Sequence, residues 1–212
     1  MTRYNAGMHD GPMTVGLDSM TRSWMVAEQV RDRCRRFAAA MDTAGVPYAV
    51  IGGNAVAAWV DTVEPAAARA TNDVDVLLRR DDLPRAIPAA LAAGFVHSRI
   101  GADMMHVFQD RPEGKTPRRA MLDAVHVIFA AERVRPTDPV PAPDVDETIT
   151  TAGMRVLTLE ALVRMKLTAH RDKDRTHIRD LIGLDLIDAA WPARLPAELG
   201  ARLQAILDNP EG

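Results

Sequence analysis

The most constraining feature of the sequence is a short apolar run that ends in two glycines. Residues 48–51 read Tyr-Ala-Val-Ile, and Gly52 and Gly53 follow directly. A short apolar run bounded by glycine is typical of a buried strand, and residues 54–59 have the composition of a helix start. Two adjacent glycines let backbone amides approach a phosphate closely, with a helix N-terminus directed at it. The run therefore predicts a strand–turn–helix unit that can receive phosphate.

Further along, Asp73 and Asp75 occupy alternate positions in the run Asp-Val-Asp-Val-Leu-Leu. Alternation predicts a strand, on which both carboxylates project from the same face. Such a pair repels itself unless a divalent cation neutralises it, and hard oxygen ligands suit Mg²⁺ or Mn²⁺. Taken alone, a Gly-Gly turn is more often a tight connection, and an Asp-x-Asp strand is more often a solvated face. Their order and spacing favour one joint site.

The rest of the chain predicts a mixed α/β body followed by a helical tail. We expect a flexible leader (1–22), an α/β core (23–134), a proline-rich strap with short strands (135–157) and a helical region (158–212). Pro136, Pro139, Pro141 and Pro143 predict an extended strap. Helices are expected over residues 24–44, 54–59, 81–93, 158–170, 174–188 and 196–207. The expected helix caps are Asp81 or Asp82, Thr158 and Asp174. Strands are expected over residues 48–51, 73–78, 96–100, 104–109 and 120–129.

Bulk properties exclude several classes of protein. A net charge of -3 argues against a broad nucleic-acid-binding surface. Cys34 is the only cysteine, so no internal disulfide can form and a cytoplasmic, reducing compartment is expected. No apolar run is long enough to span a membrane, and the leader lacks the apolar stretch of a signal peptide.

The two motifs together resemble the signature of the minimal nucleotidyltransferases in the polymerase-beta-like superfamily. The resemblance rests on Ile51-Gly-Gly-Asn-Ala-Val-Ala-Ala and Arg69-Ala-Thr-Asn-Asp-Val-Asp-Val-Leu-Leu. Leu159-Glu-Ala-Leu-Val-Arg-Met-Lys-Leu, Arg171-Asp-Lys-Asp and Asp180-Leu are similar to the helical tail of bacterial members, which include abortive-infection-type toxins. The similarity extends over about residues 46 to 190.

This resemblance implies an α+β fold, with a nucleotidyltransferase-type mixed β-sheet flanked by helices and a C-terminal helical extension. It also implies metal-dependent transfer of a nucleoside monophosphate from a nucleoside triphosphate to an acceptor, with release of pyrophosphate. The superfamily modifies antibiotics, RNA ends and proteins, so the acceptor stays open. We expect it to bind between the α/β body and the helical tail.

One position departs from the family pattern. A third carboxylate is normally found in the middle of a later strand, where this chain has His126 in Ala-Val-His-Val-Ile-Phe. A neutral imidazole could ligate a softer metal such as Mn²⁺ or serve as a general base near neutral pH. Asp123 would lie on the opposite face of a regular strand and could substitute only at a bulge. His126 could equally be a partly buried, hydrogen-bonded strand residue.

The resemblance assigns Asp73, Asp75 and His126 to catalysis and metal binding, and Gly52, Gly53 and Asn54 to the phosphates. Arg69 could contact phosphate or form a salt bridge that orders the loop before Asp73. Lys166 lies on an apolar helix face, so it should contact triphosphate, pair with the two aspartates, or extend its stem to solvent. Arg171 and Lys173 are most simply a solvated helix junction. His9, His97, His106, His170 and His177 lack the spacing of a zinc site, although His106 could face the cleft.

The leading hypothesis is therefore a metal-dependent nucleotidyltransferase. Two alternatives remain at this stage. The first is a non-enzymatic module of the same fold, which the missing third carboxylate favours. The second is a component of a toxin–antitoxin system that uses the same transfer against RNA or protein.

Overall fold

The computed structural model describes residues 15–69, 71–101, 105–111, 114–116 and 123–210, with residues 15–24 described by their backbone only. Within them a mixed sheet of seven strands has the order β3-β4-β5-β2-β1-β7-β6. Its strands are β1 (Tyr48–Ile51), β2 (Val74–Leu78), β3 (Phe95–Ile100), β4 (Met105–Asp110), β5 (Ala124–Phe129), β6 (Thr148–Thr151) and β7 (Met154–Leu157). The predicted α+β class with a mixed sheet is confirmed.

The centre of the sheet combines antiparallel and parallel pairs. β1 is antiparallel to β2, while β2 is parallel to β5 and β1 is parallel to β7. The strands of this centre are almost wholly apolar, because both faces are covered and the core needs apolar side chains on each. The register places Ile51 beside Asp75 and Asp75 beside His126 on three adjacent strands. Residues far apart in the sequence thus meet in one row across the sheet.

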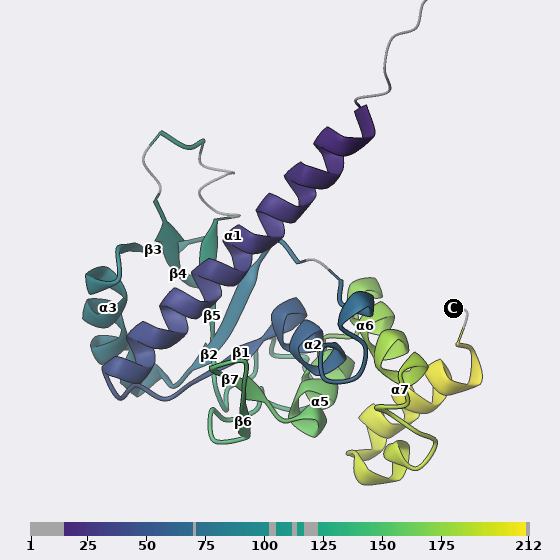
Figure 1. Cartoon of the computed structure of the whole chain (residues 1–212). Coiled ribbons are helices and arrows are strands. Elements are labelled where there is room, and N and C mark those ends of the chain that lie inside the picture. Colours follow the sequence, from purple (N-terminus) through teal and green to yellow (C-terminus); the bar gives the residue numbers. More distant parts are fainter. Residues whose placement is uncertain (1–14, 70, 102–104, 112–113, 117–122, 211–212) are drawn as a thin grey trace, which may run out of the picture.

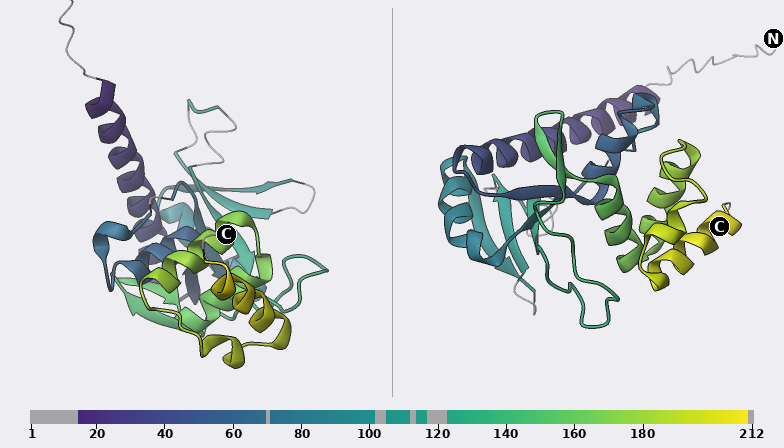
Figure 2. Two further views of the ribbon diagram at one scale, coloured as in Figure 1. Left: turned by 90° about the vertical axis from the view of Figure 1, so that its right-hand side faces the viewer. Right: turned by 90° about the horizontal axis from the view of Figure 1, so that it is seen from below.

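The helices occupy two regions around the sheet. They are α1 (Val15–Thr43), α2 (Gly52–Val60), α3 (Leu83–Ala92), α5 (Leu159–Ala169), α6 (Asp172–Gly183) and α7 (Ala197–Asp208), with short 3-10 turns at Pro65–Ala67, Arg80–Asp82 and Trp191–Arg194. Helix α1 runs across the sheet beside α3, and its first turns project beyond the body (Figure 1). Helices α2, α5, α6 and α7 gather at the other side, as the views in Figure 2 also show. No helix among the described residues is long and apolar enough to cross a membrane.

The proline-rich strap contains no helix or strand over residues 135–147, as its prolines predict, but it is not the extended tether we expected: it turns at residues 135–138 and folds back, so that Ala131 bonds to Pro143. Arginines at the end of β2 hold its base. Arg79 contacts Asp144 at 2.8 Å and Asp146 at 2.5 Å, and Arg80 contacts Glu132 at 2.7 Å. The backbone N–H of Ala142 also donates to the carbonyl of Glu132 at 2.8 Å. Because both ends of the strap are tied to the sheet, the loop between them is held over the ends of the central strands.

Several predicted boundaries are wrong. Helix α1 already begins at Val15, so residues 15–22 are helical and are not the flexible leader we expected; residues 1–14 lie outside the described residues. Helix α2 begins at Gly52, two residues earlier than predicted. Thr158 caps α5 as predicted, but the Asp82 side chain makes no capping bond with the described start of α3. The predicted strand start at Ala120 lies outside the described residues.

Helix α1 is fixed to the sheet by a buried charge cluster that the sequence did not reveal. Arg33 is only 2% exposed, and its guanidinium lies 3.0 Å from Asp123 and 3.4 Å from Asp110. Arg36 contacts Asp110 at 2.8 Å, and Lys115 contacts Asp123 at 3.0 Å. A buried charge is tolerated only when it is paired, so this cluster fixes the position of α1.

Arg33→Ala should therefore lower the free energy of unfolding by about 3 to 5 kcal/mol, since it leaves buried carboxylates without their main cation. The measurement is urea unfolding followed by circular dichroism. Arg35→Ala is the matched control, because Arg35 is an exposed neighbour on the same helix with only a 3.8 Å contact to Glu28. Equal effects of the two substitutions would contradict this role for Arg33.

Candidate functional site

The site is built around the contact between Asp75 and Gly52. Gly52 has a φ of +68° and starts α2 directly after β1. A Cβ placed on Gly52 would lie 2.4 Å from the Asp75 Oδ2, and one on Gly53 would lie 2.8 Å from the Thr71 hydroxyl oxygen. Any side chain at either position would collide with the loop and strand that carry the aspartates. The two glycines are therefore required for the close approach of α2 to β2.

One pocket opens between α2, the loop before β2 and α6; we call it the Gly-Gly pocket. Its volume is about 220 Å³, and Gly52, Gly53, Asp73 and Asp75 all line it. Both aspartates therefore face one cavity, as the sequence predicted, although Asp73 lies just before β2. The N-cap residue of α2, Ile51, makes no side-chain capping bond with the N–H groups of the first turn, and this helix N-terminus carries the positive end of the helix dipole. The wall formed by α6 contributes Lys173, His177 and Asp180.

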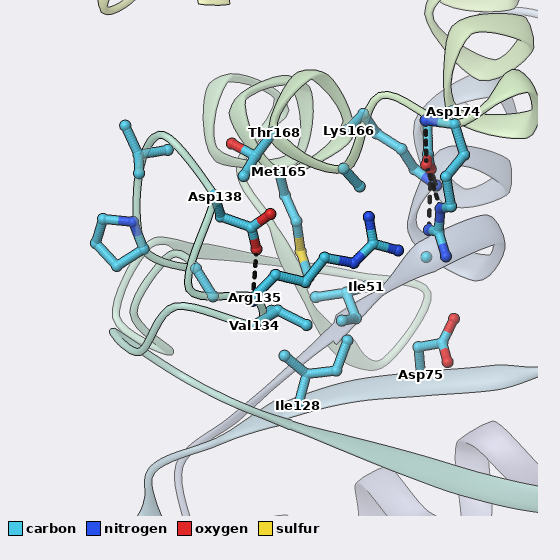
Figure 3. Close-up of a pocket in the computed structure, with 16 residues that line it drawn as sticks. Ile51, Asp75, Ile128, Val134, Arg135, Asp138, Met165, Lys166, Thr168 and Asp174 are labelled. Atoms are coloured by element: carbon cyan, nitrogen blue, oxygen red, sulfur yellow. Dashed lines mark hydrogen bonds and ion pairs between the residues drawn. The ribbon is translucent and has the colours of Figure 1, made fainter. Parts of the chain in front are cut away.

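A second pocket lies under the proline-rich strap; we call it the strap pocket. Its volume is about 110 Å³, and Gly52, Asp75, Lys166 and Arg171 line both pockets. Apolar side chains cover most of its wall: Ile51, Ile128, Val134, Val140 and Met165. Figure 3 shows the Arg135 side chain extending from the strap into this space, beside Ile51. The two pockets are therefore neighbours that meet at Gly52 and Asp75.

A buried carboxylate organises the cations at this junction. Asp174 is 1% exposed; it accepts a hydrogen bond from Lys166 Nζ at 3.0 Å and another from the Arg171 Nε at 2.7 Å. Burial holds the pKa of Lys166 below its usual value, although Asp174 opposes this, and the pKa of Asp174 is lowered because the two cations outweigh its burial. The pair is therefore charged and links α5 to α6.

This arrangement corrects three predictions. Lys166 is 5% exposed and pairs with Asp174, so it neither extends to solvent nor pairs with Asp73 and Asp75. Asp174 is not the N-cap of its helix: the helix starts at Asp172, and the Asp174 carboxylate accepts from the Arg171 backbone N–H at 3.3 Å. The Arg171 side chain is about half exposed, as a solvated junction would be, but its guanidinium pairs with the buried Asp174 at 2.7 Å.

The remaining predicted residues fall into three positions. The His126 Nδ1 lies 3.4 Å from the Asp75 Oδ1, so the structure brings His126 into the site. Arg69 forms a bidentate salt bridge with Asp180: its Nε donates to Oδ2 at 2.7 Å and its Nη2 donates to Oδ1 at 3.0 Å. This is the loop-ordering salt bridge that the sequence allowed. The Asn54 side chain lines neither pocket and donates to the Asp73 carbonyl at 2.7 Å, so it supports the loop instead of receiving phosphate as we expected.

The donor set suits a hard divalent cation. Among the described residues, the Asp73 carboxylate makes no hydrogen bond or ion pair, and Asp73 lines the same pocket as Asp75, whose Oδ1 contacts His126. No three His, Cys, Asp or Glu side chains of the described residues already converge as a preformed metal cluster. Two carboxylates in one pocket fit Mg²⁺ or Mn²⁺ when a phosphate supplies further ligands.

Sequence reasoning missed two features of the site, His177 and the strap pocket, and it offered one histidine that lies outside the site. His106, which was a candidate for the cleft, instead bonds to His97 at 2.9 Å and lines neither pocket. His177 lines the Gly-Gly pocket, although the sequence analysis considered it only as a possible zinc ligand. Its position four residues after Lys173 places both side chains on one helix face, and this spacing could have pointed to a shared polar wall. The strap pocket had no sequence signal beyond the prolines.

Comparisons with known proteins identify a family and several solved structures of similar fold. A family model described as an uncharacterised nucleotidyltransferase matches residues 21–190, which is most of the chain. No curated protein matches at a significant level.

Three solved structures are similar over most of the chain. The antibiotic-resistance factor ANT(2'')-Ia shares 14% identity at a TM-score of 0.46, covering 91% of this chain and 94% of its own. The Megavirus polyadenylate synthase shares 12% at 0.47, covering 88% of this chain and 41% of its own. JHP933 from Helicobacter pylori shares 13% at 0.37, covering 87% and 93%. Similarity at this level does not indicate a shared substrate.

Gly52→Ala should disrupt the site, because a Cβ would meet the Asp75 carboxylate and strain a positive φ. We expect the free energy of unfolding to fall by about 1 to 3 kcal/mol, as for a non-glycine residue held in a rare backbone conformation. Gly183→Ala is the control, since a Cβ at Gly183 would meet nothing within 4 Å among the described residues and its φ is not positive. Urea unfolding of both variants tests this, and a neutral Gly52→Ala would contradict it.

His177 predicts a pH dependence of stability. Burial, followed by the charge of Lys166, lowers the pKa of His177 to about 4 in the folded chain, whereas an unfolded histidine has a pKa of about 6.5. The unfolded chain therefore binds more protons between these values, and stability falls as the pH is lowered from about 7 towards 4. His177→Gln should reduce this loss in urea unfolding at pH 7 and pH 5. Thr176→Ala, which removes no titratable group, should keep the wild-type dependence; equal dependence in His177→Gln would refute the assignment.

Proposed function

Because the chain belongs to the family described as uncharacterised nucleotidyltransferases, we propose that it transfers a nucleoside monophosphate from a nucleoside triphosphate to a hydroxyl-bearing acceptor. The observation that carries this proposal is the meeting of two pockets at Gly52 and Asp75. One pocket offers glycine backbone, a helix N-terminus and two carboxylates. The other is mostly apolar and reaches the same aspartate.

The Gly-Gly pocket suits the triphosphate of the donor. The N-terminus of α2, which the Ile51 side chain does not cap, favours negative charge, and the absence of side chains at Gly52 and Gly53 allows close approach. Asp73 and Asp75 would hold Mg²⁺ or Mn²⁺, which would neutralise the phosphates and the developing charge. In this arrangement the α-phosphorus lies near Asp75, where the two pockets meet.

The strap pocket suits the acceptor. In-line displacement requires the attacking oxygen and the leaving oxygen to lie on opposite sides of the phosphorus. If the phosphates occupy the Gly-Gly pocket, the acceptor must approach from the strap pocket. Its apolar walls and about 110 Å³ of space fit a small group or one end of a larger molecule.

His126 is the candidate base for this step. It lies beside Asp75 in the register and contacts it at 3.4 Å; it lines neither pocket itself, while Ile128, two residues further on the same strand face, lines the strap pocket. An imidazole beside Asp75 can accept the hydroxyl proton as the oxygen attacks. The bond between the α-phosphorus and the bridging oxygen then breaks, and pyrophosphate leaves.

A binding module without turnover is the second candidate, because His126 occupies the position of the family's third carboxylate. The two functions differ in their products and share a donor site. Labelled nucleotide transferred to any acceptor, with metal present, would exclude the binding module.

The first experiment is a thermal-shift measurement with each of the four nucleoside triphosphates and with Mg²⁺ or Mn²⁺. The wild type should be stabilised by metal together with at least one nucleotide, because a ligand that binds only the folded state raises its stability. Asp75→Asn should lose this shift. Asp81→Asn is the control, since Asp81 is an exposed acid outside both pockets. No shift for the wild type under any condition would reject the donor site.

A further inference from the structure

Among the described residues that line the Gly-Gly pocket, His177 is the one whose ring nitrogen is buried without a partner. Its Nδ1 has no hydrogen-bond partner among the described residues. The other ring nitrogen, Nε2, is not among these buried unpartnered atoms, and the residue lines the Gly-Gly pocket. Buried polar groups are nearly always paired, and an exception calls for a ligand or another explanation. The proposed roles of Asp73, Asp75 and His126 do not use this histidine.

Lys173 stands beside His177 on the same wall. The two residues are four apart on α6, so their side chains share one helix face. Both line the pocket whose opposite wall carries Gly53 and the start of α2. A phosphate bound at the start of α2 would therefore have α6 on its other side.

Most other charges in this pocket are already neutralised. Arg69 is paired with Asp180, while Lys166 and Arg171 share Asp174. Lys173 makes no ion pair with any described residue, so its charge is available to a ligand. With Asp73 and Asp75 assigned to metal, the free cation and the unpaired imidazole lie together on α6.

We propose that His177 and Lys173 form the subsite for the β- and γ-phosphates of the donor and hold the pyrophosphate that leaves; this inference rests on the proposed function. The acceptor oxygen forms a bond to the α-phosphorus, and the bond from that phosphorus to the bridging oxygen breaks. Pyrophosphate departs with the bridging oxygen and its electron pair, and the acceptor proton passes to His126 or solvent. Lys173 and the His177 N–H neutralise and orient the departing group.

Proton uptake gives this subsite a distinctive signature. The empty ring is neutral at pH 7, because burial lowers the pKa of His177 to about 4. Phosphate charge placed beside the ring favours its protonated form. The charged groups that already act on the ring are Lys166, Lys173, Asp174 and Asp180. The loss of this uptake in His177→Gln, which leaves all four of these groups in place, assigns it to the histidine.

The test is isothermal titration calorimetry with Mn²⁺ and three probes: the nucleoside triphosphate that stabilises the wild type, the matching monophosphate, and inorganic pyrophosphate. His177→Gln and Lys173→Ala should each weaken binding of triphosphate and pyrophosphate about tenfold, as expected when one charged or hydrogen-bonded contact is lost, and leave the monophosphate unchanged. Titrations in two buffers of different ionisation enthalpy should show proton uptake for the wild type that His177→Gln lacks. His170→Asn is the control, because His170 lines neither pocket and its φ of +48° suits asparagine.

The outcomes separate this proposal from the proposed function. A wild type that binds neither triphosphate nor pyrophosphate would reject the donor site and the subsite with it. A wild type that binds both, with His177→Gln and Lys173→Ala equally tight, would reject the subsite alone. Equal weakening of the monophosphate would also overturn it, since that result indicates a general disturbance of the pocket. Lys173 is exposed, so its variant keeps the test valid if His177→Gln does not fold.

Discussion

The contact between Gly52 and Asp75 is the constraint on which the site depends. A Cβ at Gly52 would lie 2.4 Å from the Asp75 carboxylate, so α2 can start where it does only because this residue has no side chain. The same contact brings the first turn of α2 beside the aspartates. β2 also pairs with β5, and the register of that pair places His126 next to Asp75. Moving any one of these elements would separate the phosphate-binding backbone from the carboxylates.

A second interaction decides how the helical tail closes the site. Asp174 binds Lys166 and Arg171, and these cations line both pockets. Asp174 and Lys166 are both nearly inaccessible to solvent, and breaking a buried pair of this kind leaves an uncompensated charge. The ion group thus holds α5 and α6 together and keeps Lys173 and His177 of α6 opposite α2. The tail is part of the site and not only an appendage.

Local patterns were sufficient for the elements of the core. The strand at 48–51, the glycine turn and the alternating run at 74–78 all lie where period and turn chemistry predicted them. These patterns also identified Asp73 and Asp75 as sharing one cavity, since residues two apart near a strand project to one side. Helix ends were less predictable. α6 begins at Asp172, because the Asp174 carboxylate accepts from the Arg171 backbone N–H and caps the helix there. α1 begins at Val15, earlier than its apolar spacing predicted.

The sequence by itself determined the α+β class, the motif order and the two aspartates, because these follow from spacing within short segments. Only the tertiary structure decided the partners of the long polar side chains. Lys166 pairs with Asp174, Arg69 with Asp180 and Asn54 with the Asp73 carbonyl, where the sequence allowed several choices for each. The strap pocket and the position of His177 were likewise fixed only by the fold. The physical reason is that a flexible polar side chain finds its partner among groups from distant segments, and their separation is set by packing.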